Sequence, residues 1–509
     1  MTDRSAAAAG ITSAPAARLH PDAIGVMQDT VIGMASSAPA ATVGLSLAAL
    51  AAATAYGSGP ILILTAIPML IIANAYRRCN MWNANCGASF EWVGRAISPY
   101  LGFLTGWLMV AAYIIGTVAE VLLLGPSVLA VFGSTTASTW AFIGIGGAVG
   151  LIMLVVAVVG IRITARTQVS IALVEYVILI GLAVAGLVWV LGHHAGTVPI
   201  SRGWLSPSGI GGHGSAVAGF LVAVFVYGGW DGTLYVNEEV RHRRSNPGRA
   251  AILAVALLAI IYTLAQVGFQ GVVSPARLQK ASDSGTALVY VAQAIGGSGW
   301  AKAMALSIAL SVIATTGTGI VLSARIVYGM ASYRALPEFL SNVSRRFATP
   351  VAASVIVGLL IVGVSTVYYL ATSVQNAFFD VIDTTGLLFS IFYILTALAA
   401  IVYYRRRVFS SARDALILGT LPLGAAVRRV FSGARDALIL GILPLGAAGF
   451  LGWILVKSLI SAPAPQLWSL VGIVALGVIL LFTARFVLRS PFFQIRRESD
   501  AGHAPAGQD

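Results

Sequence analysis

Residues 225–232 read FVYGGWDG, and this short stretch decides how the chain can fold. It lies inside an apolar run, residues 214–237, that is long enough to cross a bilayer as one helix. Three glycines flank Asp231 there, and glycine and aspartate both weaken a helix interior. A membrane helix normally satisfies its own backbone, so a break is tolerated only beside protein or a water-filled cavity. The stretch therefore predicts a discontinuous helix next to a polar cavity.

A second interruption lies in the first apolar run, residues 24–54, where residues 33–40 read GMASSAPA. Pro39 lacks a backbone donor and frees a carbonyl one turn earlier. The two interruptions fall in the first and sixth runs, which would each open a unit of five spans. Either break alone has an ordinary explanation, because glycine and proline are common in membrane helices. Their matching positions favour a five-plus-five inverted repeat with discontinuous helices 1 and 6.

The composition agrees with an all-α membrane protein. Of 509 residues, 58% are hydrophobic and 10% are charged, and the mean hydropathy is +0.89. Soluble domains carry roughly 25% charged residues. Long apolar runs recur from Ala23 to Leu488, which excludes a β-barrel built from short alternating strands. The net charge of +13 does not indicate nucleic-acid binding, because the basic residues are spread over short loops.

The apolar runs predict about twelve transmembrane helices, at residues 24–54, 58–76, 100–132, 139–160, 167–192, 214–237, 249–273, 301–331, 350–371, 378–404, 437–460 and 467–488. With both termini in the cytoplasm, 25 of the 31 Lys and Arg residues fall inside and five outside, while Arg325 lies within the eighth span. This bias fits the positive-inside rule and predicts a multi-pass inner-membrane protein.

The domain boundaries follow from these runs. We predict a disordered cytoplasmic tail at 1–21, a membrane domain at 22–490 and a second cytoplasmic tail at 491–509. Within the membrane domain, the first repeat covers about 22–192, the second about 214–404, and the last two helices about 435–488.

Residues 406–427, RRVFSSARDALILGTLPLGAAV, recur as residues 428–449, with 19 of 22 positions identical. The first copy offers only about thirteen consecutive apolar residues before Arg428, which is too short to span a bilayer. We therefore interpret 406–427 as an extra cytoplasmic or interfacial segment. A tandem duplication without function and a regulatory insert both stay open.

FVYGGWD at 225–231, NEEV at 237–240 and Asn246-Pro247 resemble the sixth-helix signature of the amino acid-polyamine-organocation superfamily. Further matches are GFLTGW at 102–107, SAR at 323–325, ALP at 335–337 and Thr349-Pro350, so the resemblance covers roughly residues 20–490. It implies a LeuT-like fold with a substrate site between helices 1 and 6. Two features depart from the family pattern. Helix 1 has MASSAP at 34–39 instead of a glycine-rich break, and Glu175 stands where proton-coupled relatives often carry lysine.

The broken helices of such a fold suit the two charges of an amino acid, because half-helix N-termini attract a carboxylate and C-termini an ammonium. We place the carboxylate at residues 36–40 and the ammonium at carbonyls near Gly33 and residues 225–228. By resemblance, Asp231 accepts from the substrate amine and Phe225 closes over the substrate. An N-cap role for Asp231 and core packing of Phe225 are the alternatives. The candidate substrate site comprises Gly33, Met34, Ala35, Ser36, Ser37, Ala38, Phe225, Tyr227, Gly228, Gly229, Trp230 and Asp231.

Glu175 is the candidate coupling residue, because an ionisable group deep in a membrane helix is costly and functional by default. It could carry a proton, or bind sodium together with hydroxyls of Thr315, Thr316 and Thr318. It could also only hold the helix 1 break open through a hydrogen bond. Glu120, near the outer end of the third span, is expected to reach water by snorkelling.

The sequence thus predicts a secondary active transporter for neutral or cationic amino acids, working by alternating access with proton-coupled uptake. An amino acid/polyamine exchanger and a sodium symporter stay open as alternatives. A channel or a membrane enzyme is disfavoured, because the sequence lacks a filter loop, a metal-ligand motif and a nucleophile motif. The predicted partners are a small amino acid or amine, a coupling ion (H⁺ or Na⁺) and membrane lipid, with no cofactor, metal or nucleic acid.

Overall fold

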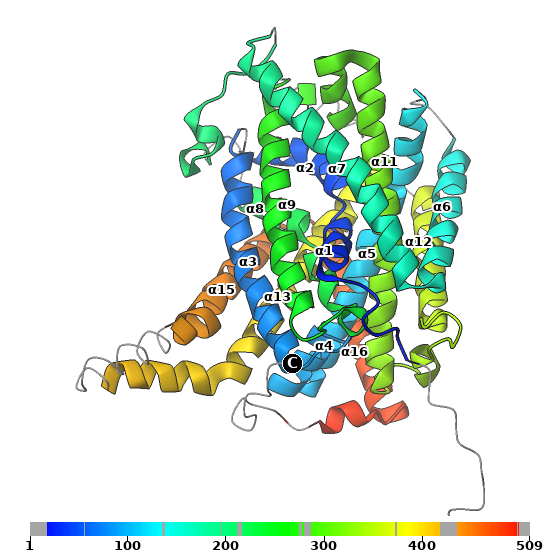
Figure 1. Cartoon of the computed structure of the whole chain (residues 1–509), viewed down its shortest axis with the longest axis vertical. Helices are drawn as coiled ribbons and strands as arrows, with labels where there is room; N and C mark the ends of the chain where they lie inside the picture. The colour runs from blue at the N-terminus through cyan, green and yellow to red at the C-terminus, as the bar shows by residue number, and fades with distance from the viewer. Residues whose placement is uncertain are drawn as a thin grey trace, which may run out of the picture.

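The chain is described by a computed structural model at residues 18–54, 56–134, 138–194, 196–210, 216–273, 277–278, 287–371, 374–417, 435–495 and 497, without the side chains at 45, 52, 374–383 and 406–417. The described part is built almost entirely of helices that run roughly along one direction as a bundle (Figure 1). Of the predicted tail at 1–21, only residues 18–21 are described. Of the duplicated segment 406–427, the backbone of 406–417 is described and continues α13 as a helix, whereas 418–427 lie outside the described residues.

The first half of the bundle begins with two short helices in line and continues with longer ones. They are α1 (Val26–Ala35), α2 (Pro39–Thr54), α3 (Ser58–Trp82), α4 (Ser89–Ala96), α5 (Pro99–Val131), α6 (Thr139–Val159) and α7 (Ile161–Leu191). Local sequence sets several of the starts. Pro39 and Pro99 occupy the first positions of α2 and α5, where the missing N–H costs nothing. Ser138 caps α6 by accepting from the Ala141 N–H.

The second half repeats this pattern of a short helix followed by longer ones. Its elements are α8 (Ala216–Tyr227), the 3₁₀ turns η3 (Trp230–Leu234) and η4 (Asn237–Glu239), α9 (Asn246–Gln270), α11 (Ala287–Ser332), α12 (Val351–Ala371) and α13 (Val374–Ile417). Two further helices follow, α15 (Leu443–Ser461), preceded by the π-helical turn η7 (Leu438–Ile442), and α16 (Ala464–Phe482), followed by the π-helical turn η8 (Thr483–Val487).

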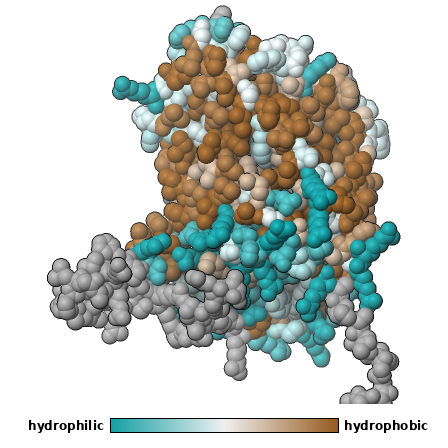
Figure 2. Space-filling view, in the orientation of Figure 1, coloured by the Kyte–Doolittle hydropathy of each residue, from teal (hydrophilic) through white to brown (hydrophobic). Residues whose placement is uncertain are grey.

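Eleven helices of the described chain are long and apolar enough to cross a membrane. The first predicted span is not among them because it is divided into α1 and α2, which have 10 and 16 residues. The eleven helices and this divided one together account for the twelve predicted spans. On the face shown in Figure 2, apolar residues form a broad band across the bundle, and polar residues gather below it. This distribution is that of a protein whose outer face contacts lipid.

Three boundaries differ from the prediction. The second half of the sixth span is a pair of 3₁₀ turns, η3 and η4, instead of an α-helix. α11 begins at Ala287, well before the predicted residue 301, and bends at Gly296 and Gly297, whose backbone angles are not helical. The connection between the second and third spans contains the amphipathic helix α4, which was not predicted.

α1 and η3 lie inside the bundle, where α1 packs against α7 and α9, and η3 packs against α1 and α9. The surrounding helices approach closely through small residues. A Cβ atom added to Gly186 on α7 would come within 2.5 Å of the Gly268 carbonyl oxygen on α9, so this contact requires glycine. Close packing of this kind joins α7 to α9, the two helices against which α1 packs.

Candidate functional site

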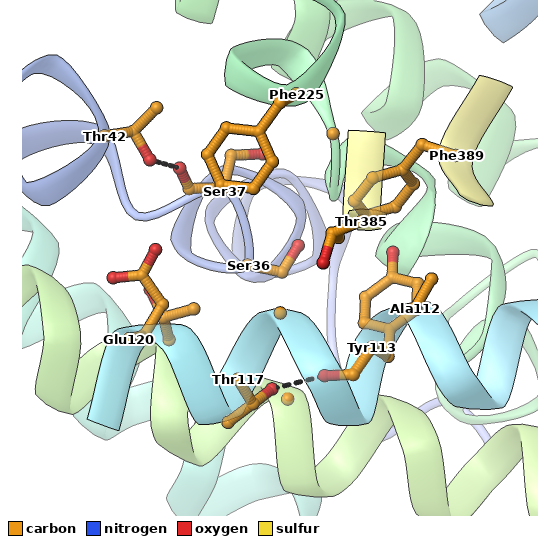
Figure 3. Close-up of a pocket in the computed structure, with 14 residues that line it drawn as sticks. Ser36, Ser37, Thr42, Ala112, Tyr113, Thr117, Glu120, Phe225, Thr385 and Phe389 are labelled. Carbon is orange, nitrogen blue, oxygen red and sulfur yellow. Dashed lines mark hydrogen bonds between the residues drawn. The ribbon is translucent and has the colours of Figure 1, made fainter. Parts of the chain in front are cut away.

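A cavity lies at the centre of the bundle, where the two interrupted helices meet (Figure 3). It contains about 430 Å³ of space not filled by atoms, counting its open side. Among the described residues that line it, Glu120 is the only charged one. Its walls come from the α1–α2 break, α5, the end of α8, α11 and α13, through Ser36, Ser37, Thr42, Ala112, Tyr113, Gly116, Thr117, Glu120, Phe225, Gly228, Thr315, Gly319, Thr385 and Phe389.

The α1–α2 break is held open by side chains from two other helices. Thr315 Oγ1 on α11 donates to the Ala35 carbonyl at the end of α1, over 2.7 Å. The Ala40 N–H in the first turn of α2 donates to Glu175 Oε1 on α7, over 3.0 Å. Between them, Ala38 adopts a positive φ of 44°. Helix ends leave backbone groups without partners, and these two side chains supply them.

The α8–η3 break touches the first one directly. Gly229 has φ of 106°, and a Cβ atom there would lie 2.6 Å from the Ser36 carbonyl oxygen. The Gly229 carbonyl accepts from the Ser36 hydroxyl and, at 3.3 Å, from the Tyr113 hydroxyl on α5. Glycine is required at this position both for its backbone angle and for the close approach. The two breaks predicted from the sequence are therefore in contact.

One face of α5 supplies the long wall of the cavity. Tyr113, Gly116, Thr117 and Glu120 follow one another at helical spacing along it, and all four line the cavity. Glu120 is only 4% exposed, and its Oε2 atom has no hydrogen-bond partner among the described residues. The expectation that Glu120 reaches water at the end of its span is therefore wrong, because its side chain turns inward.

Most of the predicted substrate-site positions do not reach this cavity. Ser36, Ser37, Phe225 and Gly228 line it, and so does Thr315 from the coupling set. The remaining predicted residues pack around the two breaks without lining the cavity: Gly33, Met34, Ala35, Ala38, Tyr227, Gly229, Trp230 and Asp231, with Glu175 and Thr316 from the coupling set.

Asp231 shows why some of the predicted residues do not line the cavity. It is fully buried, and its carboxylate accepts from the Tyr393 hydroxyl on α13 at 2.7 Å and from the Tyr235 hydroxyl. The alternative of an N-cap is wrong, because Gly229 occupies the position before η3. Contact with a substrate would require the cavity to extend to Asp231, which is fully buried and does not line it. The substrate role of Asp231 stays a prediction.

The aromatic neighbours of Asp231 are likewise engaged in packing. Trp230 stacks on Tyr393 with 5.3 Å between ring centroids, and the Tyr227 hydroxyl donates to the Leu62 carbonyl at 3.1 Å. Phe225, in contrast, presents its ring to the cavity opposite Phe389 (Figure 3). Of the three aromatic residues predicted on this helix, Phe225 alone is a cavity residue.

Of the predicted coupling residues, Thr315 lines the cavity, whereas Glu175 and Thr316 do not. Glu175 is fully buried, and its Oε2 atom has no partner among the described residues, while Oε1 accepts from Ala40. The hydroxyls of Thr316 and Thr318 donate to carbonyls of their own helix, at 2.8 and 3.1 Å. Within the described residues, no group of three or more His, Cys, Asp or Glu side chains could hold a metal ion.

The sequence model of the family described as amino acid permease matches residues 28–487. The chain belongs to this family. The permease is 28% identical over 189 residues to the human large neutral amino acids transporter small subunit 2, with 37% of the permease and 33% of the human protein covered. It is 29% identical over 150 residues to the mouse Asc-type amino acid transporter 1, with 30% and 27% covered. The match thus spans a third or less of the length of these relatives.

The permease also resembles solved structures of a manganese transporter from Eremococcus coleocola. One of them, in complex with an aromatic bis-isothiourea substituted compound, gives a TM-score of 0.51 at 12% identity, covering 91% of the permease and 95% of that chain. A mutant of the same transporter gives a TM-score of 0.53. At this identity the likeness concerns the fold alone, and it confirms the predicted LeuT-like architecture. Membership of a permease family also supports a transport protein over an enzyme.

Proposed function

We propose that the permease is a secondary active transporter that binds an amino acid in the central cavity and moves it by alternating access. The observation that carries the proposal is that both interrupted helices contribute residues to one cavity, through Ser36, Ser37, Phe225 and Gly228. Interrupted helices at the middle of a membrane supply transporters with backbone groups for a substrate. Two relatives are named as transporters of large neutral amino acids and of Asc-type amino acids. These names support an amino acid as the substrate class.

In this proposal the substrate carboxylate lies against the α1–α2 break and the ring of Phe225 covers it. The Ala40 N–H is occupied by Glu175, and the hydroxyls of Ser36 and Ser37 line the cavity as donors at the break. The Ser37 hydroxyl is the freer of the two, because its hydrogen bond to the Gly33 carbonyl is long, at 3.4 Å. The substrate ammonium lies on the other side, among the carbonyl and hydroxyl oxygens near Gly228.

Counterflow in proteoliposomes tests this function. Vesicles loaded with an unlabelled amino acid should accumulate the labelled one from outside, which a channel or an enzyme would not produce. Phe225→Ala should weaken apparent affinity about fivefold or more, because it removes an apolar cover worth at least about 1 kcal/mol. Phe486→Ala is the matched control, since Phe486 is 64% exposed on the outer face of the bundle. Absence of counterflow with every amino acid would refute the proposal.

We further propose that proton movement is coupled to transport through Glu175. Its support is a fully buried carboxylate that holds the α1–α2 break with one oxygen and leaves the other without a partner among the described residues. Glu175→Gln should retain counterflow but lose accumulation driven by a pH gradient. Undiminished accumulation would refute the proton role, and a strict sodium requirement in the unmodified protein would favour the sodium alternative, with Thr315 as a contributing hydroxyl.

The orientation belongs to the same proposal. We place both termini in the cytoplasm, on the basis of the distribution of Lys and Arg. Reporter enzymes fused after Arg244 and Arg497 should be active on the cytoplasmic side, and one fused after Lys280 on the external side. An external result at Arg497 alone would mean that the duplicated segment crosses the membrane.

A further inference from the structure

Glu120 is a charged group that the proposed function has not used. Its carboxylate is 4% exposed, lines the cavity, and leaves Oε2 without a hydrogen-bond partner among the described residues. In Figure 3 the carboxylate projects from α5 toward Thr42 and Ser37 at the start of α2. A buried carboxylate without a partner costs stability, and a ligand that brings a positive charge and N–H donors removes that cost.

The surroundings offer no protein cation to fill this role. None of the described residues that line the cavity is Lys, Arg or His. A second carboxylate, Glu175, caps the N-terminus of α2 and opposes the positive end of that half-helix. The Glu120 carboxylate therefore has no positive counterpart among the described residues that line the cavity, which favours a substrate cation beside it.

Two threonine hydroxyls line the cavity with Glu120, and Thr42 is the one on the side toward which the carboxylate points (Figure 3). Thr42 Oγ1 donates to the Ser37 carbonyl at 2.7 Å, and Thr117 Oγ1 donates to the Tyr113 carbonyl at 2.6 Å. Each hydroxyl keeps lone pairs as acceptors after donating its proton. An alkylammonium carries three N–H donors. The Glu120 carboxylate and the Thr42 hydroxyl supply acceptors for it on one side of α5, whereas Thr117 lies on the other side, with its hydroxyl against Gly319 (Figure 3).

We propose that Glu120, with Thr42, forms a cation subsite that selects substrates with a second ammonium group on an aliphatic chain. The Tyr113 hydroxyl lies 3.3 Å from the Gly229 carbonyl at the α8–η3 break. Glu120 follows Tyr113 by seven residues, about 10 Å along the helix axis. A substrate held at the breaks by its amino end can therefore extend a flexible four-carbon stem toward Glu120, as lysine would.

This inference rests on the proposed transport function and adds the class of substrate. The alkylammonium group could belong to a dibasic amino acid or to a diamine. Uptake and counterflow in proteoliposomes should therefore be measured with lysine, with cadaverine and with leucine. Transport of lysine, with or without transport of cadaverine, supports the subsite. Cadaverine lacks the α-carboxylate of lysine, so its result tells whether a substrate must also carry a carboxylate.

Glu120→Gln is the decisive variant, because it keeps the size of the side chain and removes the charge. It should lower the efficiency of lysine transport about tenfold or more relative to leucine, since a charge-assisted hydrogen bond is lost. Asp29→Asn is the matched control. Asp29 is equally buried on α1, both its oxygens lack described partners, and it does not line the cavity. This control should leave the lysine-to-leucine ratio unchanged.

Two results would overturn the subsite while leaving the transport function standing: leucine transport without any lysine or cadaverine transport, or an unchanged lysine-to-leucine ratio in Glu120→Gln. Failure of every substrate in counterflow would instead refute the transport function itself. Should Glu120→Gln fail to fold, Thr42→Val provides a second test. It removes one acceptor and should reduce lysine transport several-fold relative to leucine, and an unaffected ratio there counts equally against the subsite.

Discussion

Replacing Arg325 with methionine should open the end of the bundle at which α1 begins. Arg325 on α11 and Glu239 are both fully buried and form a two-pronged ion pair, Nε to Oε2 at 3.0 Å and Nη2 to Oε1 at 3.2 Å. The Glu239 carbonyl in turn accepts from the Ala23 N–H at 2.8 Å, just before α1. One ion pair thus connects α11, the end of η4 and the entrance to α1.

The expected magnitude follows from burial. Removing one partner of a fully buried ion pair costs about 3–5 kcal/mol, mainly because the other charge is left without compensation. A free energy of 1.4 kcal/mol corresponds to tenfold. If the pair persists only while this end is closed, Arg325→Met lowers the ratio of closed to open protein by roughly a hundredfold or more. Arg325→Met combined with Glu239→Leu should recover most of the loss, because no isolated charge then remains.

Cys86 offers a built-in measurement of this opening. It is fully buried, its N–H donates to Glu238 Oε1 at 3.1 Å, and burial raises the pKa of its thiol. The thiol should therefore react slowly with a maleimide until this end opens. In a Cys79→Ala background, Arg325→Met should raise the alkylation rate of Cys86 about a hundredfold.

The matched control for this experiment is Arg334→Met. Arg334 forms an ion pair with Glu338 at 3.2 Å, but its side chain is 60% exposed, so its loss should change the alkylation rate little. The reasoning fails if Arg325→Met leaves the rate at Cys86 within about threefold of the parent, or if the double variant with Glu239→Leu reacts as fast as Arg325→Met alone.

Three further predictions concern the breaks and the duplicated segment. Gly229→Ala should lower the melting temperature in detergent by several degrees, because a Cβ atom there would clash with the Ser36 carbonyl. Gly297 also has a positive φ but has open space around it, so Gly297→Ala should lower the melting temperature less. Equal shifts would contradict the argument from close approach. Asp231→Ala should also lower the melting temperature, because it leaves two tyrosine hydroxyls without their acceptor. Phe225→Ala should weaken substrate binding without this loss of stability. Weakened substrate binding at unchanged stability in Asp231→Ala would place Asp231 at the substrate. Deleting residues 406–427 should preserve counterflow, and an inactive but well-inserted deletion would make the segment functional.

The two helix breaks could be predicted from the sequence because their cause is local. Proline at 39 and the glycines at 228 and 229 change the backbone wherever the chain places them, and both breaks lie where expected. The twelve crossings were equally predictable, since length and apolarity alone decide them. The conformation of the chain beyond the second break was harder to predict. η3 is a 3₁₀ turn that packs against α1 and α9, and such contacts between distant segments are not visible in the sequence.

The direction in which a side chain faces explains the remaining errors. Asp231 and Glu120 are both carboxylates in apolar spans, and the sequence offers no reason to prefer one for the cavity. The structure turns Asp231 toward two tyrosines and Glu120 into the cavity. One signal could have identified Glu120. Tyr113, Gly116, Thr117 and Glu120 form a stripe of small and polar residues at spacings of three and four on an otherwise apolar helix, and such a stripe marks one face.

On the two sides of its break, the first helix is hydrogen-bonded to two different helices. The end of α1 is tied to α11 through Thr315 and Ala35, whereas the start of α2 is tied to α7 through Glu175 and Ala40. A tilt of α1 would stretch the first hydrogen bond and leave the second intact, and a tilt of α2 would do the opposite. The Thr315–Ala35 hydrogen bond therefore restrains α1 relative to α11, and the Ala40–Glu175 hydrogen bond restrains α2 relative to α7. Each bond opposes the tilt of one half-helix.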